Sequence, residues 1–238
     1  MNVLVINGSP KCDASNTMKL TNALLEGIAE NKENIIKKLT IKDMDITPCL
    51  GCMSCWGKTA GKCVIDDVMT TVYQEIMKAD LVIESFPLYF FGMPGPMKTF
   101  TDRMMPLMET YKGECMTIGD NAFHAPRFDM SGKKLVLVST CGYARTEEIY
   151  DSLIKEYNFI CGKDNYLSLL CPQGEMFAIP PLEPQVNAYV DRYRWIGRLL
   201  GRGESVPDEM VKKASEPILP HKAFKTLVNN YWNSCYKK

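Results

Sequence analysis

Hydrophobic positions along the chain fall into short continuous runs separated by longer stretches of mixed pattern. Short apolar runs that end at turn-forming residues are typical of strands buried in a parallel sheet. Runs of this kind predict five strands, at residues 3–6, 35–41, 79–86, 134–140 and 166–171. The second run is mixed in character, which indicates a strand nearer the edge of the sheet.

Between these runs, apolar residues recur every three or four positions, which is the spacing of one face of a helix. The spacing predicts helices at 15–28, 66–77, 94–108, 147–160 and 185–200. Asp66 and Asp67 open the second of these, where carboxylates accept hydrogen bonds from free first-turn amides. Strands alternating with helices predict an α/β fold, a doubly wound five-stranded parallel sheet covered on both faces.

Two segments depart from this alternation. Residues 110–131 show no clear periodicity and are long enough to form a lid or a binding loop. After Pro172 the pattern changes to IPPLEP, one amphipathic helix and short helices to the end. We therefore expect a domain at 1–173 and a helical C-terminal extension at 174–238, packed on the core or at a subunit interface. The tyrosines and Trp195 of that extension are expected to pack rather than to line a substrate site.

Composition and charge exclude several classes of partner. The 238 residues are 46% hydrophobic and 24% charged, with 28 basic against 28 acidic side chains, so a nucleic-acid partner is not expected. The opening MNVLVINGSP lacks the basic segment of a signal peptide, and no stretch reaches the roughly 18 apolar residues of a membrane span. We expect a cytoplasmic protein without a membrane partner. Structural disulfides are rare in that compartment, so its ten cysteines need another explanation.

Candidate chemistry begins at the loop after the first predicted strand. Ligands of open parallel sheets bind beyond the carboxyl ends of the strands, where the strand order reverses. The first loop, GSPKCDASNT, lacks both the GxGxxG and the GK[ST] patterns of nucleotide-binding loops. Its hydroxyls, its amide and the following helix N-terminus suit a single phosphate monoester. The alternative is an ordinary polar loop in which Ser15 caps the helix.

The loop after the third predicted strand is SFPLYFFGMPGPMKTFTDR, where apolar side chains cluster without a folding reason. A flat hydrophobic ligand would bury them. Here the sequence resembles the flavodoxin-like NADPH-dependent FMN reductase family, including the multimeric flavodoxins and the iron–sulfur flavoproteins. The resemblance covers roughly residues 1–173 and rests on both loops, on CLGCMSCWGKTAGKC followed by DD, and on STCGY.

The resemblance implies a bound FMN. The first loop would hold it through Ser9, Lys11, Ser15, Asn16 and Thr17. The isoalloxazine would be lined by Pro87, Leu88, Tyr89, Phe90, Gly92 and Met93, and approached by Thr140, Cys141, Gly142 and Tyr143. The resemblance also assigns Lys98, Asp102 and Arg103 to a helix used for dimer contacts near the flavin. The alternatives are a solvated helix face for Asp102 and Arg103, a small residue beside the ring for Cys141, and a loop cap for Tyr143.

The cysteine loop has its own pattern. Cys49, Cys52 and Cys55 are spaced CxxCxxC, and Cys63 follows after seven residues. Such spacing lets one loop supply the thiolates of an iron–sulfur cubane, whereas structural zinc sites usually split their ligands into two pairs. Iron–sulfur flavoproteins carry a compact four-cysteine motif here and bind a [4Fe-4S] cluster, but related reductases with a similar loop are described simply as flavoproteins. A cluster, a loop of free thiols and a zinc site therefore remain open. It also remains open whether Cys63, which follows the 56–61 insert, is a ligand.

A bound flavin would itself carry the redox chemistry, so no catalytic side chain is required. The only two histidines, His124 and His221, lie beside no plausible nucleophile, although His124 would reach a substrate if residues 110–131 folded over the flavin. We expect an FMN-dependent NAD(P)H oxidoreductase that passes electrons to a quinone, flavin or similar acceptor, as a homodimer or homotetramer. A ferredoxin-like protein is a second candidate donor. The alternatives are an iron–sulfur flavoprotein in single-electron transfer and a non-catalytic flavin-binding redox sensor.

Overall fold

A five-stranded parallel sheet forms the centre of the molecule. The structure is a computed structural model that describes residues 1–110, 117–118, 121–122 and 124–236. The strand order is β2-β1-β3-β6-β7, and every neighbouring pair is parallel. The strands are β1 (Asn2–Asn7), β2 (Ile35–Thr40), β3 (Leu81–Pro87), β6 (Lys134–Thr140) and β7 (Leu167–Cys171). The predicted fold class is confirmed, and β2 lies at an edge as its mixed pattern indicates.

The register of the sheet brings the strand ends together. Asn7 of β1 pairs with Ser85 of β3, and Pro87 of β3 pairs with Thr140 of β6. The chain moves outward from β1 to β2 and then returns to the other side of β1, so the strand order reverses between β1 and β3. The loops after β1, β3 and β6 therefore leave the sheet side by side at the position where ligands bind in such folds.

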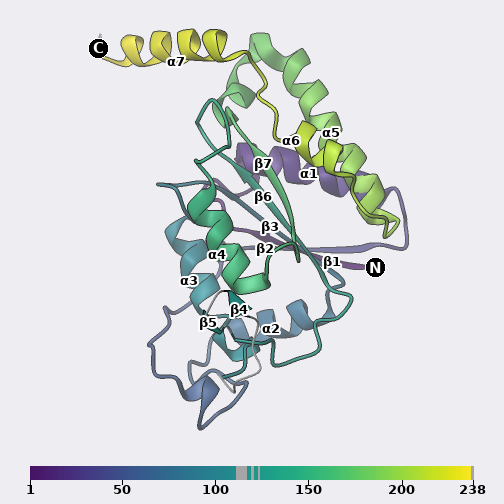
Figure 1. Cartoon of the computed structure of the whole chain (residues 1–238), viewed down its shortest axis with the longest axis vertical. Helices are drawn as coiled ribbons and strands as arrows, with labels where there is room; N and C mark the ends of the chain where they lie inside the picture. Colours follow the sequence, from purple (N-terminus) through teal and green to yellow (C-terminus); the bar gives the residue numbers. More distant parts are fainter. Residues whose placement is uncertain (111–116, 119–120, 123, 237–238) are drawn as a thin grey trace.

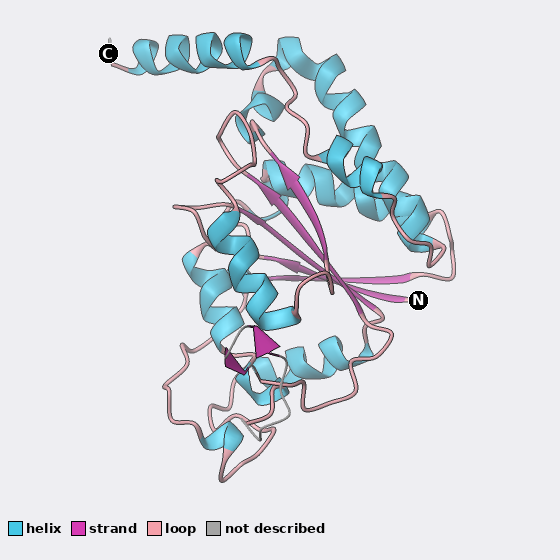
Figure 2. Cartoon of the chain, in the orientation of Figure 1, coloured by secondary structure: helices cyan, strands magenta, loops and turns pink. Residues whose placement is uncertain are grey.

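Helices cover both faces of the sheet (Figures 1 and 2). One face carries α1 (Asn16–Ala29), α5 (Glu183–Gly201) and α6 (Asp208–Ala214). The other carries α2 (Met69–Lys78), α3 (Gly95–Asp102) and α4 (Asp151–Cys161). Successive side chains of a strand point to opposite faces, so Val3 and Val5 pack under α1 while Leu4 and Ile6 pack in the other layer.

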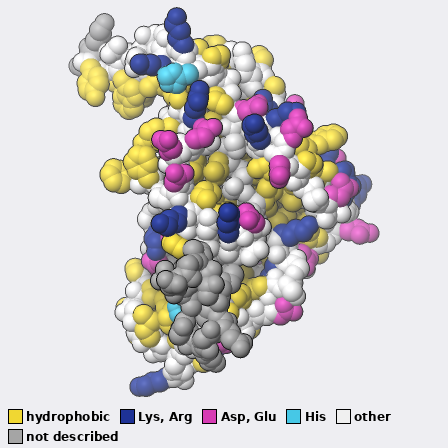
Figure 3. Space-filling view, in the orientation of Figure 1, with side chains coloured by type: hydrophobic (Ala, Val, Ile, Leu, Met, Phe, Trp, Pro, Cys, Tyr) yellow, Lys and Arg dark blue, Asp and Glu magenta, His cyan; other side chains and the backbone are white. Residues whose placement is uncertain are grey.

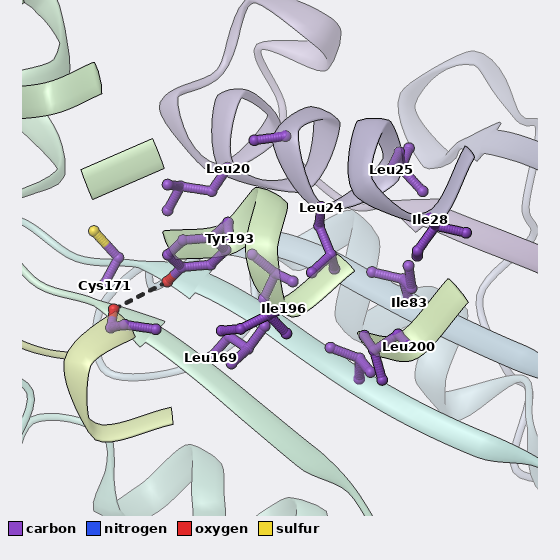
Figure 4. Packing of buried hydrophobic residues seen from close by; sticks show 14 of the residues in the cluster. Leu20, Leu24, Leu25, Ile28, Ile83, Leu169, Cys171, Tyr193, Ile196 and Leu200 are labelled. Carbon is purple, nitrogen blue, oxygen red and sulfur yellow. Dashed lines mark hydrogen bonds between the residues drawn. The ribbon is translucent and has the colours of Figure 1, made fainter. Parts of the chain in front are cut away.

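Helix α5 lies directly against α1, and two glycines permit the close approach. A Cβ atom on Gly197 would lie 2.0 Å from the backbone oxygen of Leu24, and one on Gly27 would lie 2.1 Å from that of Arg194. In Figure 4, Leu24, Ile196 and Leu200 fill the space between the two helices and the sheet. The extension therefore shares a core with the α/β part, while the division into 1–173 and 174–238 stays a prediction.

The last helix, α7 (His221–Cys235), projects from the body of the molecule (Figure 1). Phe224 is buried, whereas Tyr231 and Trp232 are exposed. Figure 3 shows hydrophobic side chains gathered on this helix. Within the part of the chain that the structure describes, no helix is both long and apolar enough to cross a membrane.

Three predicted helices have different bounds in the structure. The helix predicted from residue 66 begins only at Met69. The helix predicted at 94–108 ends at Asp102, and a separate 3-10 turn, Met105–Leu107, follows. Pro106 lies in that turn, and the residue before a proline is disfavoured in an α-helix. The helix predicted from residue 147 begins only at Asp151, because Glu148 adopts a left-handed φ of 63°.

Two further expectations are corrected. The prediction that Trp195 packs is wrong, because its side chain is 51% exposed and the Arg198 guanidinium lies 5.6 Å from its ring centre. Tyr189 and Tyr193 of the same helix are buried as predicted, whereas Tyr231 of α7 and Tyr236, which follows that helix, are exposed, so the packing prediction is wrong for them. The segment without clear periodicity contains a short antiparallel pair that was not predicted, β4 (Thr117–Ile118) and β5 (Asn121–Ala122). The lid prediction for residues 110–131 lies in part on residues outside those that the structure describes, and it stays a prediction.

Candidate functional site

The loop after β1 is a tightly hydrogen-bonded polar turn. The Ser9 amide donates to the Asn7 side-chain oxygen at 3.0 Å, and the Ser9 hydroxyl accepts from the Lys11 amide at 3.3 Å. The Ser15 hydroxyl accepts from the Met18 amide at 3.0 Å and so caps α1. The capping interpretation of Ser15 is confirmed. A hydroxyl that accepts one bond still has a proton to donate, so the cap leaves Ser15 able to bind an anion.

Asn16 and Thr17 connect this loop to other parts of the chain. The Asn16 amide donates to the Gly174 carbonyl at 2.8 Å. The Thr17 hydroxyl lies 2.6 Å from the Thr140 hydroxyl, and both side chains are buried. The ends of β1, β6 and the segment after β7 therefore form one connected polar surface.

The loop after β3 exposes aromatic side chains. Tyr89 and Gly92 exchange two backbone hydrogen bonds of 3.0 Å, which close a tight turn. Phe90 and Phe91 in this turn have left-handed φ values of 48° and 65°, an uncommon conformation for bulky residues that concentrates at functional sites. Phe90 is 99% exposed. A constrained turn therefore holds these aromatic side chains in their exposed positions.

The loop after β6 closes against the aromatic turn. The Phe91 ring lies 5.6 Å from that of Tyr143, and the Leu88 amide donates to the Thr140 carbonyl at 2.8 Å. Cys141 is buried, and this burial raises the pKa of its thiol. A buried neutral thiol fits the interpretation of Cys141 as a small residue of the loop.

Sequence reasoning missed the contribution of residues 173–175. The buried Gln173 amide nitrogen donates to the carbonyls of Ala144 and Leu219, at 3.3 and 3.0 Å. Glu175 lies close enough to Gly142 that an added Cβ would be 2.4 Å from its carboxylate oxygen. The available signal was topological, because this segment directly follows β7 and leaves the sheet at the same edge. Phe91 was also left out of the predicted ring contacts.

The four cysteines of the loop after β2 gather around one surface hollow. Cys49, Cys52, Cys55 and Cys63 all line it, together with Arg103. Burial raises the pKa of Cys55, and the negative charges of the other three cysteines raise it further. Among the described residues, no three His, Cys, Asp or Glu side chains are placed to hold one metal ion. A cubane spreads its thiolates over four irons, so four thiols around one hollow fit that donor set in type and number.

Arg103 lies beneath this hollow and not on a solvated face, so the alternative of a solvated position is wrong for it. Its side chain is 1% exposed and makes two bonds to Asp67, at 2.7 and 3.0 Å. Burial would raise the pKa of Asp67, but hydrogen bonds from Arg103 and from the amides of Met69 and Thr47 outweigh it and lower the pKa. Asp67 accepts from the Met69 amide at 3.0 Å, a first-turn amide as predicted, but the N-cap position of α2 is taken by Val68. Asp102 does lie on a solvated face, paired with Lys98.

His124 packs against the cysteine loop instead of the aromatic turn. Its ring centre lies 4.2 Å from that of Trp56, and its Nδ1 lies 2.8 Å from the Glu109 carbonyl. The Trp56 indole donates to the Met105 carbonyl at 3.0 Å. The insert that contains Trp56 therefore serves as the packing surface for the described end of the 110–131 segment.

Two buried side-chain atoms in the described part of the chain lack a hydrogen-bond partner. They are Nδ2 of Asn7 and Nε of Arg103. Buried polar groups are nearly always paired, so each of these donors is free to bind an acceptor from a water or a ligand. One orphan belongs to Asn7 at the end of β1, and the other belongs to Arg103, which lines the cysteine hollow.

Comparisons with known proteins show the family of the chain. The profile of a family described as having a flavodoxin-like fold matches residues 1–160. An iron–sulfur flavoprotein of Methanocaldococcus jannaschii is 35% identical over 108 residues, 45% of this chain and 53% of that protein. The chain thus spans about half the length of such relatives. An FMN-dependent NADH:quinone oxidoreductase of Bacillus anthracis is 24% identical over 84% of this chain and 95% of that protein.

Solved structures show the same fold at low identity. An azoreductase from Bacillus anthracis superimposes with a TM-score of 0.61 at 15% identity, covering 83% of this chain and 99% of that one. An NAD(P)H:quinone oxidoreductase from Methanothermobacter marburgensis gives the same TM-score at 18% identity, covering 84% and 98%. These likenesses establish the fold of the chain.

Proposed function

The chain belongs to the flavodoxin-like fold family, and from this premise we propose that it is an FMN-dependent oxidoreductase. It takes electrons from NAD(P)H and passes them to a quinone, flavin or similar small acceptor. One observation carries the proposal. A polar loop at a helix N-terminus and a constrained aromatic turn lie side by side where the strand order reverses, between β1 and β3. Relatives named as FMN-dependent NADH:quinone oxidoreductases support the choice of cofactor, donor and acceptor.

The first loop would hold the phosphate of FMN. Its hydroxyls can donate while still accepting their internal bonds, and the amides at the start of α1 favour an anion. The orphaned Nδ2 of Asn7 adds a donor beneath this loop. The predicted phosphate residues are Ser9, Lys11, Ser15, Asn16 and Thr17.

The second and third loops would hold the isoalloxazine. Tyr89, Phe90 and Phe91 expose apolar surface there, and Tyr143 packs against Phe91 from the neighbouring loop. When bound, the flavin supplies hydride and electron transfer. The residues of this chain orient it and exclude water from one side, which is why the proposal assigns no catalytic acid or base.

FMN binding and turnover test the proposal directly. Apoprotein is titrated with FMN, and NAD(P)H oxidation is then followed with a soluble quinone. Asn16→Asp places a negative charge at the N-terminus of α1, and we expect at least tenfold weaker FMN binding, about 1.4 kcal/mol. Asn22→Asp, six residues further along α1, is the matched control and should bind as the wild type does. A chain that takes up no FMN contradicts the proposal, and one that binds FMN without turnover supports a redox sensor instead.

We further propose a cytoplasmic homodimer or homotetramer without nucleic-acid or membrane partners. The support for the assembly is the exposed apolar surface of α7 together with the resemblance to multimeric flavodoxins. Sedimentation equilibrium of the FMN-bound chain tests the state of assembly. A monomer at micromolar concentration would contradict this part of the proposal and leave the proposed activity untouched.

A second candidate function is single-electron transfer through a [4Fe-4S] cluster held by Cys49, Cys52, Cys55 and Cys63. The convergence of the four thiols on one hollow supports it, as do the relatives named iron–sulfur flavoproteins. A ferredoxin-like protein would then be the donor. Anaerobic purification followed by iron and sulfide assays tests this candidate: about four irons per chain are expected, and their absence after reconstitution would eliminate it.

A further inference from the structure

Arg103 has an environment that flavin binding does not explain. It follows the last turn of α3, yet its side chain is 1% exposed. Arginine is almost never fully buried unless it is paired, and burying an ion pair costs several kcal/mol of desolvation per ion, about as much as the pairing returns. A buried arginine of this kind points to a requirement for positive charge at that position.

The guanidinium reaches the cysteine loop. Nη2 lies 3.5 Å from the Cys63 sulfur, within hydrogen-bond range for a sulfur acceptor, and the same nitrogen donates to Asp67. Arg103 lines the hollow, and its buried Nε has no hydrogen-bond partner in the described chain. Arg103 therefore has one donor on a cysteine sulfur and a second, buried donor still to be satisfied.

The position of Arg103 is fixed from three sides. Nη1 donates to the Thr47 carbonyl at 2.5 Å and to Asp67. Asp67 is itself held by the amides of Thr47 and Met69, at 3.1 and 3.0 Å. The backbone carbonyl of Arg103 accepts from the Tyr73 hydroxyl at 2.5 Å. Helices α2 and α3 and the segment after β2 thus hold a planar donor group in one orientation, a task for which lysine lacks the forked geometry.

We propose that Arg103 is the positioning residue that makes Cys63 the fourth thiolate of a [4Fe-4S] cluster. The first three cysteines are spaced closely enough for one loop to present them, whereas the insert separates Cys63 from the rest. The bond from Nη2 fixes the Cys63 sulfur at the hollow, and the unpaired Nε–H would be a further donor for the bound cluster. Hydrogen bonds to the sulfurs and nearby charge also set the reduction potential. The inference rests on the second candidate function above and is independent of FMN.

Iron content after anaerobic reconstitution of the full chain is the first test. The wild type should hold about four irons, and Cys63→Ser about three, because one corner loses its thiolate. Arg103→Met should match Cys63→Ser. The matched control is Arg127→Met, since Arg127 also pairs with a carboxylate and packs on the same loop at Gly61. The control should keep the wild-type iron content.

The reduction potential of the cluster is the second test. It distinguishes an electrostatic role of Arg103 from a purely structural one. Asp67→Asn leaves the arginine in place but removes its countercharge, so the reduced and more negative cluster becomes easier to form. We expect at least a tenfold higher ratio of reduced to oxidised cluster at a fixed potential, equivalent to about 59 mV for one electron. A merely structural role would lower the iron content without this shift.

Three outcomes overturn the inference: wild-type chain without iron, Arg103→Met with full iron content, or Asp67→Asn with an unchanged potential. Where Arg103→Met fails to fold because Asp67 is left as an unpaired buried charge, the double variant Asp67→Asn/Arg103→Met removes both charges and should still hold about three irons. FMN content is measured in every sample. Loss of iron with FMN retained concerns this inference alone, whereas a chain without FMN concerns the proposed oxidoreductase.

Discussion

At the scale of single residues, the candidate flavin site depends on hydrogen bonds between polar side chains that lie far apart in the sequence. Thr17 and Thr140 come from opposite halves of the α/β part, and their hydroxyls meet in a buried position. The same two loops would enclose the cofactor. A substitution here therefore affects both folding and binding.

Thr17→Val tests this link. Valine keeps the shape of threonine but leaves the Thr140 hydroxyl buried and unpaired, which costs about 1–3 kcal/mol. We expect the free energy of unfolding in urea to fall by that amount and FMN binding to weaken. Thr226→Val, on the surface of α7, is the control and should change the free energy of unfolding by less than about 0.5 kcal/mol. Equal stability of the two variants would contradict the prediction.

Residue roles that depend on local chemistry could be predicted from the sequence. Ser15 as a helix cap and Asp67 as an acceptor for first-turn amides both follow from their positions before an apolar repeat. The burial of Arg103 could not be predicted, because it depends on the carboxylate of Asp67, 36 positions away, and on the cysteine loop, which has no periodic pattern. The same holds for the burial of Gln173, whose side-chain oxygen accepts a hydrogen bond from the distant Leu219 amide.

At the scale of elements, the buried strands were predictable because an apolar run is a local signal. Their C-terminal bounds agree with the predicted ones to within one residue, for example at residues 140 and 171. Helix bounds were less predictable where one backbone conformation interrupts a helical pattern, as at Glu148. The helical spacing predicted α5 itself but not its contact with α1, because a periodic pattern shows which face of a helix is buried and not which helix packs against it.

The contact between α1 and α5 predicts a large effect for Gly197→Ala. The added methyl group would meet the backbone of Leu24, which cannot move aside as a flexible side chain could. We expect the free energy of unfolding to fall by about 1–3 kcal/mol, as in other overpacked interiors. Gly95→Ala is the control, because no atom lies within 4 Å of the position that its Cβ would take. Thermal unfolding of both variants checks the difference, and a stable Gly197→Ala would show that the helices can separate without cost.

A partly buried carboxyl joins β3 to α4 and predicts a dependence of stability on pH. Burial raises the pKa of Glu84 above its ordinary value of 4.5, although the hydrogen bond from the Tyr157 hydroxyl opposes the shift. The folded chain then keeps this proton after the unfolded chain has lost it. From about pH 4.5 upward, the free energy of unfolding should therefore fall by up to about 1.4 kcal/mol per pH unit until Glu84 ionises in the folded state.

Urea unfolding of Glu84→Gln across this range measures the effect. Glutamine cannot ionise, so the variant should lack this part of the pH dependence and gain stability relative to the wild type as the pH rises. Glu33→Gln, at an exposed position, should keep the wild-type profile. Parallel profiles for the wild type and Glu84→Gln would mean that Glu84 is already ionised in the folded protein.

At the scale of the whole molecule, the C-terminal extension contributes unequally to the fold. Helix α5 and the end of α6 complete one of the two hydrophobic cores, through Tyr193, Ile196, Leu200 and Ala214. Helix α7 buries Phe224 and otherwise projects away (Figure 1). Ending the chain at residue 173 would expose the apolar face of α1, whereas ending it at Pro220 would leave both cores covered.

Two truncations test this difference. The 1–173 fragment should show no cooperative thermal unfolding, because each large apolar side chain that loses its burial removes about 1.5–3 kcal/mol from a total of about 5–15 kcal/mol. The 1–220 fragment should unfold cooperatively with a loss of about 1–3 kcal/mol, the contribution of Phe224. Circular dichroism of both fragments, with the full chain as the control, measures the transition. A cooperative transition in 1–173 would establish it as an independent domain and show that α5 is an addition to the core rather than one of its layers.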